Sequence, residues 1–426
     1  MRYLPITQNL FIENRKRLIN KLANNSVAIL FSNDQQPRNG DQYFPFRQQS
    51  DFFYLTGIDQ EKSILLITKN GSKSKENLFL LKTNEQIAIW EGHKYTKPEA
   101  KTTSGIKSIF WLDDFEITLR ETLLSTNNIY LIQNELPKFN PDVIDRNQRM
   151  GKKIRKQYPL NSYHRLAPLL TKLRLIKSAH EIELLRIACD ITNKAFRRVL
   201  ATIKPKMYEF EVQAEIEHEF TINRANGHGY APIIASGANA CILHYIENDK
   251  QCKSGDLILF DFGAEYANYT ADMSRTIPVN GKYNNRQKEC YNAVLHVFKE
   301  AIKLYVPGNT INKVNEEVNL MMETEMIKLG LFTSADVKNQ DKENPLFKKY
   351  FMHGTAHFLG LDVHDVGEKN IEFKAGMVLT CEPGIYIPDE HIGIRIENDI
   401  LITEELPIDL MEDIPIEIDE IEKLMK

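Results

Sequence analysis

The sequence predicts an α/β (α+β) protein of two domains, and three observations support this prediction. The chain has 426 residues, more than one ordinary hydrophobic core organises. Its first part mixes short apolar runs (VAILF, SILLI, NLFLL, NIYLI) with helical stretches, which is typical of an α/β domain. After residue 253 the strand candidates become strongly apolar: LILFDFG, MVLTCEPGIYI and IGIRIENDILI. We therefore expect one domain over residues 1–172 and a second over residues 173–426.

The start of a helix places this boundary. Ser178 and Glu181 have the spacing of a capping box and precede the helical periodicity of AHEIELLRIACDITNKAF. Two more helices are expected near residues 284–305 and 310–329, between the apolar strands.

Composition excludes several classes of protein. Hydrophobic residues make up 42% of the chain, and no run approaches the ~18 apolar residues of a membrane span. The first residues lack the apolar stretch of a secretory signal, so the expected location is cytoplasmic. A net charge of -4 gives no electrostatic case for binding nucleic acid or anionic lipid. The five cysteines form no CxxC pair and are expected to be reduced core residues.

An internal similarity predicts a duplicated half-domain. Residues 253–261 (KSGDLILFD) and 374–382 (KAGMVLTCE) each read Lys, a small residue, Gly and then a strand, with an acid eight positions after the Lys. Glycine before a buried strand is common, so coincidence is the alternative. Because both copies deliver a carboxylate at the same offset, we favour duplication, with a site shared between the halves.

Four carboxylates lie in apolar strand patterns, where an ionised group costs several kcal/mol unless it is paired. They are Asp261, Asp272, Glu382 and Glu397. Arginine partners are one explanation, and Arg275 and Arg395 are near enough in sequence to serve two of the acids. That explanation leaves the other two acids without a counter-charge, so cations of another kind are favoured.

Histidines supply a further ligand type. His353, His357 and His364 fall within twelve residues, just before the last two acids. Two Asp, two Glu and one His carry four negative charges, which match two divalent ions. Oxygen-rich ligands favour manganese, with cobalt, iron or zinc as alternatives. Two ions ~3.5 to 4 Å apart can lower the pKa of a water between them toward ~7, so the predicted chemistry is metal-assisted hydrolysis.

No rival catalytic motif competes with this prediction. The sequence has no GxSxG elbow, no P-loop and no GxGxxG in a βαβ context.

At these residues the sequence resembles the pita-bread metallopeptidases, the family of aminopeptidase P, prolidase, creatinase and methionine aminopeptidase. The order Asp, a second Asp eleven positions later, then His in HGTAHFLG, Glu in EPGIY and Glu in RIEND is that family's five-ligand pattern. The resemblance covers essentially the whole chain. Its most specific points are aminopeptidase P features: SGANACILHY (236–245), HGTAHFLGLDVHDVG (353–367), RNGDQYFPFRQQSDFFYLTG (38–57) and the terminal EIEKLM.

The resemblance implies a fold, an activity and a metal site. The fold is an N-terminal domain of the creatinase/aminopeptidase P type followed by a pita-bread domain with an internal pseudo-two-fold repeat. The activity is hydrolysis of the N-terminal Xaa-Pro bond of peptides through a hydroxide bridging two metal ions. Asp261 would hold one ion, and His357 and Glu382 the other. Asp272 and Glu397 would bridge both.

Further roles follow from the same resemblance. Glu382 would also act as general base. His244 and His364 would steady the scissile carbonyl and the developing oxyanion, which suits hydrogen-bond donors. His353 would line the proline pocket. The supporting network that relays protons or positions the substrate amine would consist of Arg395, Tyr386 and Asp41.

Trp90 in IAIWEGHKY matches a tryptophan that in aminopeptidase P reaches the active site of a neighbouring subunit. The resemblance therefore implies a homodimer or homotetramer, with the N-terminal domain serving oligomerisation and substrate access. His93-Lys94 departs from the family, where Arg is common. Ordinary packing of Trp90, and a solvated turn for Asp41, are the alternatives.

Four alternative functions share part of this resemblance. Prolidase shares the metal site but cuts only dipeptides, and no group that would capture a free carboxylate is evident in the sequence. A non-catalytic pita-bread module is disfavoured because all five ligands are present. Creatinase does not need the carboxylate set, and methionine aminopeptidase fits poorly with the long N-terminal domain.

Overall fold

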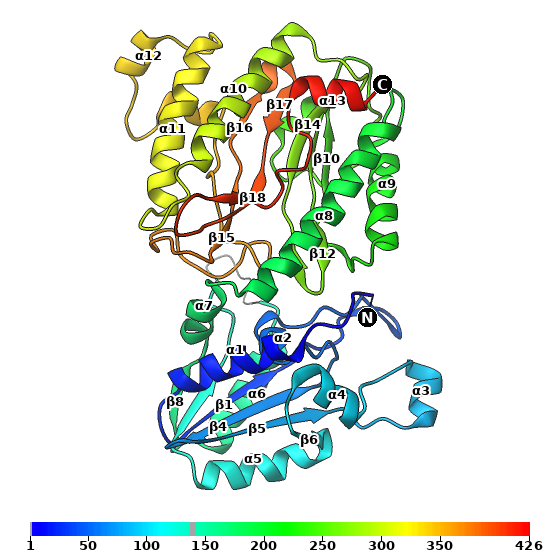
Figure 1. The fold of residues 1–426 in the computed structure, drawn as a ribbon, viewed down its shortest axis with the longest axis vertical. Helices are drawn as coiled ribbons and strands as arrows, with labels where there is room; N and C mark the ends of the chain where they lie inside the picture. The colour runs from blue at the N-terminus through cyan, green and yellow to red at the C-terminus, as the bar shows by residue number, and fades with distance from the viewer. Residues whose placement is uncertain (1, 137–141) are drawn as a thin grey trace. The chain divides into compact units, whose positions relative to one another are not determined.

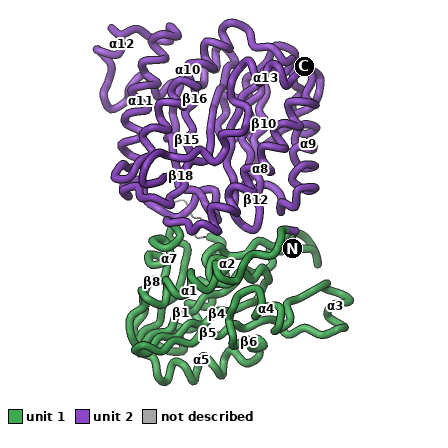
Figure 2. The backbone as a smooth tube through the Cα atoms, in the orientation of Figure 1, with its two compact units in different colours: residues 1, 3–174 green, residues 2, 175–426 purple. Residues whose placement is uncertain are grey.

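The computed structural model of the protein describes residues 2–136 and 142–426. The chain divides into two compact units, residues 3–174 and residues 175–426, with Arg2 grouped with the second (Figure 2). The division lies two residues beyond the position predicted from the sequence.

The first unit is built on a mixed six-stranded sheet (Figure 1). Its strands are β1 (Ser26–Phe31), β4 (Ile64–Asn70), β5 (Lys73–Leu80), β6 (Ser108–Trp111), β7 (Asn128–Leu131) and β8 (Ser162–Arg165). The spatial order is β6-β5-β4-β1-β7-β8. β1 pairs antiparallel with β4 and parallel with β7. The apolar runs read as strands from the sequence form β1, β4, β5 and β7.

Alternation along β1 explains how the sheet is covered. Val27, Ile29 and Phe31 point to one face and share a core with Phe115 and Ile154. These last two come from α5 (Phe115–Leu124) and α6 (Arg146–Gln157). The unit's other helices are α1 (Gln8–Lys21), α2 (Ser50–Thr56), α3 (Glu85–Glu91), α4 (Lys97–Ser104) and α7 (Ala167–Arg174). A small hairpin is formed by β2 (Pro37–Asn39) and β3 (Gln42–Tyr43).

The second unit contains two similar halves. In the first half, α8 (Ala179–Thr202) and α9 (Glu209–Ile222) precede β10 (Ile233–Ser236), β11 (Leu257–Asp261) and β14 (Ser274–Pro278), which form one antiparallel sheet. In the second half, α10 (Asn285–Ile302) and α11 (Ile311–Lys328) precede β15 (Val378–Cys381) and β18 (Asn398–Leu401), also antiparallel. The repeated segments 253–261 and 374–382 contain β11 and β15, so the repeat seen in the sequence corresponds to equivalent strands of the two halves.

Shorter elements complete the second unit. The strands are β9 (Gly227–His228), β12 (Ala264–Tyr266), β13 (Tyr269–Thr270), β16 (Gly384–Ile387), β17 (Ile392–Arg395) and β19 (Ile408–Asp409). The helices are α12 (Ser334–Lys338) and α13 (Ile418–Leu424), and a 3-10 turn, η2, spans Gly237–Cys241. Ser178 caps α8 with the predicted capping box, and the other two predicted helices are α10 and α11.

Strand ends are where the structure corrects the sequence. MVLTCEPGIYI forms two strands, β15 and β16, and IGIRIENDILI forms β17 and β18. Glu382 and Glu397 lie at these breaks, and Asp272 lies in the connection before β14. Only Asp261 is inside a strand, as its last residue. The expectation that all four acids lie within strands was therefore wrong. Because the strand is interrupted at each break, these side chains do not have to alternate between the two faces of a sheet.

All five cysteines are free thiols, four of them buried and Cys241 half-buried. Among the described residues, no helix combines the length and apolar character needed to cross a membrane.

Candidate active site and metal centre

Acidic and imidazole groups from both halves of the second unit meet at one point. One ligand atom each from Asp272, His357 and Glu397 lies within 4.8 Å of the other two, so these residues could hold a metal ion. His357 Nε2 lies 3.3 Å from Asp272 Oδ2 and 3.8 Å from Glu382 Oε1. These residues are far apart in the sequence, and the fold brings them together.

Backbone hydrogen bonds hold the acids where strands end. The N–H of Glu397 donates to the carbonyl of Ser274 at 3.1 Å, joining the two halves of the unit. The N–H of Glu382 donates to the carbonyl of Thr355 at 2.9 Å. These contacts fix the main chain directly at both acids.

Asp261 joins this cluster through Arg395. Arg395 Nη2 donates to Asp261 Oδ2 at 2.5 Å, while Nε donates to Ser274 Oγ at 2.7 Å and Nη1 to Tyr386 Oη at 2.9 Å. The other carboxylate oxygen, Asp261 Oδ1, is buried and has no hydrogen-bond partner among the described residues. A buried acceptor without a partner is costly, and a bound cation would satisfy it.

Arginines do not neutralise the four acids. Arg275 is fully buried, but its guanidinium donates to the carbonyls of Ser274, Glu397 and Pro415 and to Asn398 Oδ1. Arg395 contacts Asp261, and its Nε is 3.9 Å from Glu397. One guanidinium therefore faces four carboxylates, and the explanation by arginine pairing alone fails.

The electrostatics show an excess of negative charge. Burial raises the pKa of Asp261 and of Glu397, and the neighbouring carboxylates add to the rise. Burial also raises the pKa of Glu382 to about 7. Burial works to lower the pKa of His357, but the hydrogen bond to Asp272 and the charge of Glu382 outweigh it and raise the pKa to about 9. Carboxylates that attract protons this strongly also attract divalent cations, so the donor set fits a metal centre.

His353 connects to this cluster through a chain of hydrogen bonds. Its Nδ1 lies 2.8 Å from the carbonyl of Gly354, and its Nε2 lies 2.7 Å from Tyr386 Oη. Burial, helped by the charge of Arg395, lowers the pKa of His353 to about 4. The neutral ring then donates from Nδ1 and accepts from Tyr386, whose oxygen in turn accepts from Arg395.

The other two predicted histidines lie beside these rings. The His364 ring centroid is 4.5 Å from that of His357, with the planes almost perpendicular at 88°. His244 is exposed, and its charge is close enough to contribute to lowering the pKa of His353. Of the two histidines predicted as donors, His364 therefore contacts the His357 ring, and His244 lies within electrostatic range of His353.

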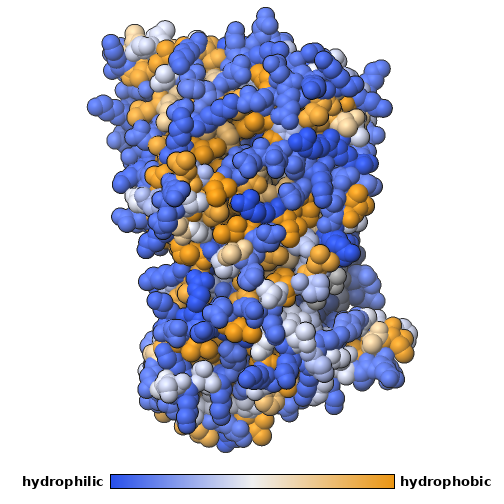
Figure 3. Space-filling model, in the orientation of Figure 1, coloured by the Kyte–Doolittle hydropathy of each residue, from blue (hydrophilic) through white to orange (hydrophobic). Residues whose placement is uncertain are grey.

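Asp41 and Trp90 belong to the first unit. Asp41 is exposed between β2 and β3 and accepts a hydrogen bond from Gln42 Nε2 at 3.0 Å. Trp90 is 84% exposed in α3, next to Ile89, which is 79% exposed. Figure 3 shows apolar side chains on the surface at the place where Figure 1 draws α3. Packing within the first unit, the alternative for Trp90, is therefore wrong.

Several contacts of the acids had not been predicted. Tyr230 Oη donates to Asp272 Oδ1 at 2.5 Å, and Ser274 Oγ donates to Glu397 Oε2 at 2.6 Å. The backbone N–H of Asp272 donates to Asp399 Oδ2 at 3.2 Å. Ser274 follows Asp272 by two residues, which was a local signal; nothing in the sequence linked Tyr230 to an acid forty residues later.

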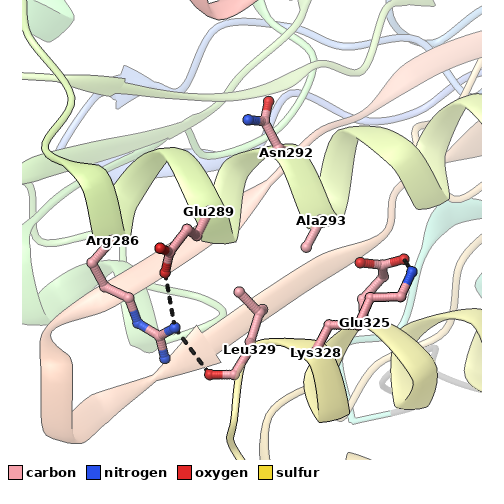
Figure 4. Close-up of a pocket in the computed structure, with 7 residues that line it drawn as sticks. All are labelled: Arg286, Glu289, Asn292, Ala293, Glu325, Lys328 and Leu329. Atoms are coloured by element: carbon pink, nitrogen blue, oxygen red, sulfur yellow. Dashed lines mark hydrogen bonds and ion pairs between the residues drawn. The ribbon is translucent and has the colours of Figure 1, made fainter.

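A hollow lies between α10 and α11 (Figure 4). It has a volume of about 430 Å³ and is lined by Arg286, Glu289, Asn292, Ala293, Glu325, Lys328 and Leu329. Arg286 donates there to Glu289 and to the carbonyl of Leu329. None of the predicted site residues lines it.

Comparison with known proteins decides the family. The model of metallopeptidase family M24 matches residues 183–404, more than half of the chain and all five predicted ligands. The chain belongs to metallopeptidase family M24. Residues 11–130 match the model described as the aminopeptidase P N-terminal domain. The resemblance found from the sequence is confirmed, and M24 membership implies divalent metal ions at the acidic cluster.

Individual M24 proteins resemble this one over their full length. The Xaa-Pro aminopeptidase of Haemophilus influenzae is 36% identical, over 97% of this chain and 96% of the relative. That of Escherichia coli strain K12 is 34% identical, over 99% and 98%. The structure of Escherichia coli aminopeptidase P with the inhibitor Pro-Leu gives a TM-score of 0.88 at 34% identity, covering 99% of both chains. The predicted fold class, an α/β domain followed by a pita-bread domain, is confirmed.

Proposed function

We propose that this protein is an Xaa-Pro aminopeptidase, a metallopeptidase that removes the N-terminal residue of a peptide whose second residue is proline. The convergence of four carboxylates with His357 carries the proposal, because that donor set fits divalent ions. Relatives that match over their full length carry the name Xaa-Pro aminopeptidase. A non-catalytic module would have no need for this cluster.

The ligand assignment inferred from the sequence is kept as part of this proposal. Asp261 would hold one ion, His357 and Glu382 the other, and Asp272 and Glu397 both. The oxygen-rich donor set favours two manganese ions per subunit over cobalt, iron or zinc. When bound, such ions would polarise the scissile carbonyl and lower the pKa of a water, so that hydroxide is available at neutral pH to attack the carbonyl carbon.

The chain's own groups supply the remaining chemistry. Glu382, beside His357 and 3.7 Å from His353 Nδ1, would take the proton of the attacking water and deliver it to the leaving amine. His244 and His364 would donate hydrogen bonds to the oxygen of the scissile carbonyl as negative charge develops there. Neutral His353 would line the proline pocket, with its orientation fixed by Tyr386 and Arg395. Asp41 is assigned to the same supporting network.

Assembly and location complete the proposal. The exposed Trp90 of α3 would enter the active site of a second copy in a homodimer or homotetramer. The first unit would thereby serve oligomerisation and access of substrate. The proposed location is cytoplasmic, and fractionation of cells that express the protein tests it.

Cleavage of defined peptides by the manganese-loaded protein tests this function. We expect release of arginine from Arg-Pro-Pro, no release from Arg-Ala-Pro, and loss of activity in Glu382→Gln. Cleavage of Ala-Pro without cleavage of Arg-Pro-Pro would identify a prolidase instead. Prolidase is not favoured, because the relatives matched over their full length are named as aminopeptidases. Inactivity on both Arg-Pro-Pro and Ala-Pro at full metal occupancy would contradict hydrolysis of an Xaa-Pro bond.

A further inference from the structure

A buried carboxylate lies at the start of α9 and is not one of the predicted site residues. Glu209 is the first residue of this helix and is fully buried. Its side chain accepts five hydrogen bonds, from Ser236 N, Ser236 Oγ, Asn239 Nδ2, Tyr245 Oη and Lys250 N, at 2.7, 2.7, 3.3, 2.7 and 3.0 Å. A carboxylate with this many donors is a rigid junction.

All of these donors come from one segment, residues 236–250, and this segment carries His244. The segment leaves β10, forms η2 and then turns, with Tyr245 N donating to the carbonyl of Ile242 at 3.3 Å. His244 lies inside this turn and is exposed, whereas Tyr245 is 4% exposed. Fixing Tyr245 therefore limits the positions that the His244 ring can take.

The anchored segment also packs against elements that bear site residues. Tyr245 and Ala240 share a core cluster with Leu259 and Tyr386. Gly393 lies directly against Ala240, since a Cβ on this glycine would be 2.1 Å from the Ala240 carbonyl oxygen. Gly393 is in β17, two residues before Arg395. The junction at Glu209 is thus continuous with the strands that end at Asp261 and Arg395.

We propose that Glu209 is a positioning residue, which acts through Tyr245 to hold His244 where it meets the carbonyl oxygen of the substrate. This inference rests on the proposed function for the role of His244. In this proposal Glu209 and Tyr245 contribute to catalysis indirectly, without touching the substrate or the metal ions.

Kinetics of Tyr245→Phe and Glu209→Gln in the full-length, manganese-loaded enzyme test the proposal. We expect kcat on Arg-Pro-Pro to fall about tenfold or more in each, with KM changed less than about threefold, since misplacing a catalytic group slows chemistry. In a His244→Ala background, Tyr245→Phe should have almost no further effect. An equal loss in both backgrounds would show that the anchor acts independently of His244 and would overturn the proposal.

Tyr291→Phe is the matched control. Tyr291 is buried in α10, and its hydroxyl donates to the carbonyl of Ile416 at 2.7 Å, so the variant loses a comparable hydrogen bond far from the proposed anchor in sequence. It should keep the wild-type kcat. A similar fall in kcat for Tyr291→Phe would attribute the effect to general loss of packing.

Hydrogen exchange separates this inference from the proposed function. Peptides spanning residues 237–250 should exchange faster in Glu209→Gln and Tyr245→Phe, and at the wild-type rate in Tyr291→Phe. Unchanged exchange would overturn the anchor whatever the activity. Faster exchange in a protein that cleaves neither proline peptide would support the anchor while refuting the proposed function.

Discussion

The hydroxyl of Ser274 donates a hydrogen bond to Glu397 Oε2 over 2.6 Å, across a bridge that joins the two halves of the second unit. Ser274 Oγ also accepts from Arg395 Nε. One small side chain thus orients both an acid of the proposed metal centre and the arginine that contacts another, Asp261.

Replacing this hydroxyl should weaken the metal centre. In Ser274→Ala we expect metal affinity to fall about 10- to 100-fold, the usual cost of losing a group that orients a ligand. Titration with manganese, followed by calorimetry, measures it. Ser254→Ala removes an exposed hydroxyl of the same unit and serves as the control. Equal affinities in Ser274→Ala and wild type would contradict the role of this contact.

Metal removal should lower stability as well as activity. Burial and mutual repulsion of the acids disfavour the metal-free cluster, so ions that bind it stabilise the fold, by about 2.7 kcal/mol at 100 times Kd. Thermal unfolding with chelator and with added manganese measures the effect. An Asp272→Asn/Glu397→Gln double variant should show no manganese-dependent shift. A wild-type melting temperature that ignores both chelator and manganese would count against the metal centre.

The buried ion pair Lys177–Asp365 should matter for stability. Its atoms are 3.1 Å apart, and each side chain is 1% exposed. Lys177→Met should destabilise the second unit by about 3 to 5 kcal/mol, because it removes one charge of a buried ion pair. The exposed pair Lys303–Glu300 is the control, where Lys303→Met should have a much smaller effect, because solvent screens the charges. Denaturant unfolding compares them, and similar losses would argue against the buried pair's importance.

Acid should destabilise the protein through His228. Burial lowers the pKa of His228 to about 4, from an ordinary value of 6.5. Because the unfolded chain takes up the proton first, stability should fall as pH drops from 6.5 toward 4, by up to about 3 kcal/mol. Unfolding measured across this range should show a shallower fall in His228→Phe. His180→Gln, at an exposed position, is the control, and an identical slope in all three would refute the assignment.

The proposed homo-oligomer should depend on Trp90. Its side chain is 84% exposed, and tryptophan is enriched among the interface residues whose truncation costs about 2 kcal/mol or more. Trp90→Ala should therefore weaken association about 30-fold, as followed by light scattering over a dilution series. Leu160→Ala, at another exposed apolar position of the first unit, should leave association unchanged. A wild-type protein that is monomeric at high concentration would disprove the oligomer.

The sequence alone predicts which residues bind metal, but not the backbone positions that they occupy. The acids at positions 261, 272, 382 and 397 were recognisable because charge inside apolar runs needs compensation, which is a local rule. Their exact backbone setting was not, because three of them lie at strand breaks or in a connection. A local sequence pattern indicates which residues are buried and whether apolar residues alternate. A break between two strands inside an apolar run alters neither property, so the pattern does not reveal it.

By itself the sequence determined the donor types, the duplicated strand unit, the principal helices and the family. Only the tertiary structure decided which groups face those donors: Tyr230 toward Asp272, Ser274 toward Glu397, and Arg395 rather than Arg275 toward Asp261. Hydrogen bonds and ion pairs act over a few ångströms, and the residues that form them here are 42, 123 and 134 positions apart. The fold of the first half closes the separation between Tyr230 and Asp272, and the packing of the two halves closes the other two. No local pattern encodes either.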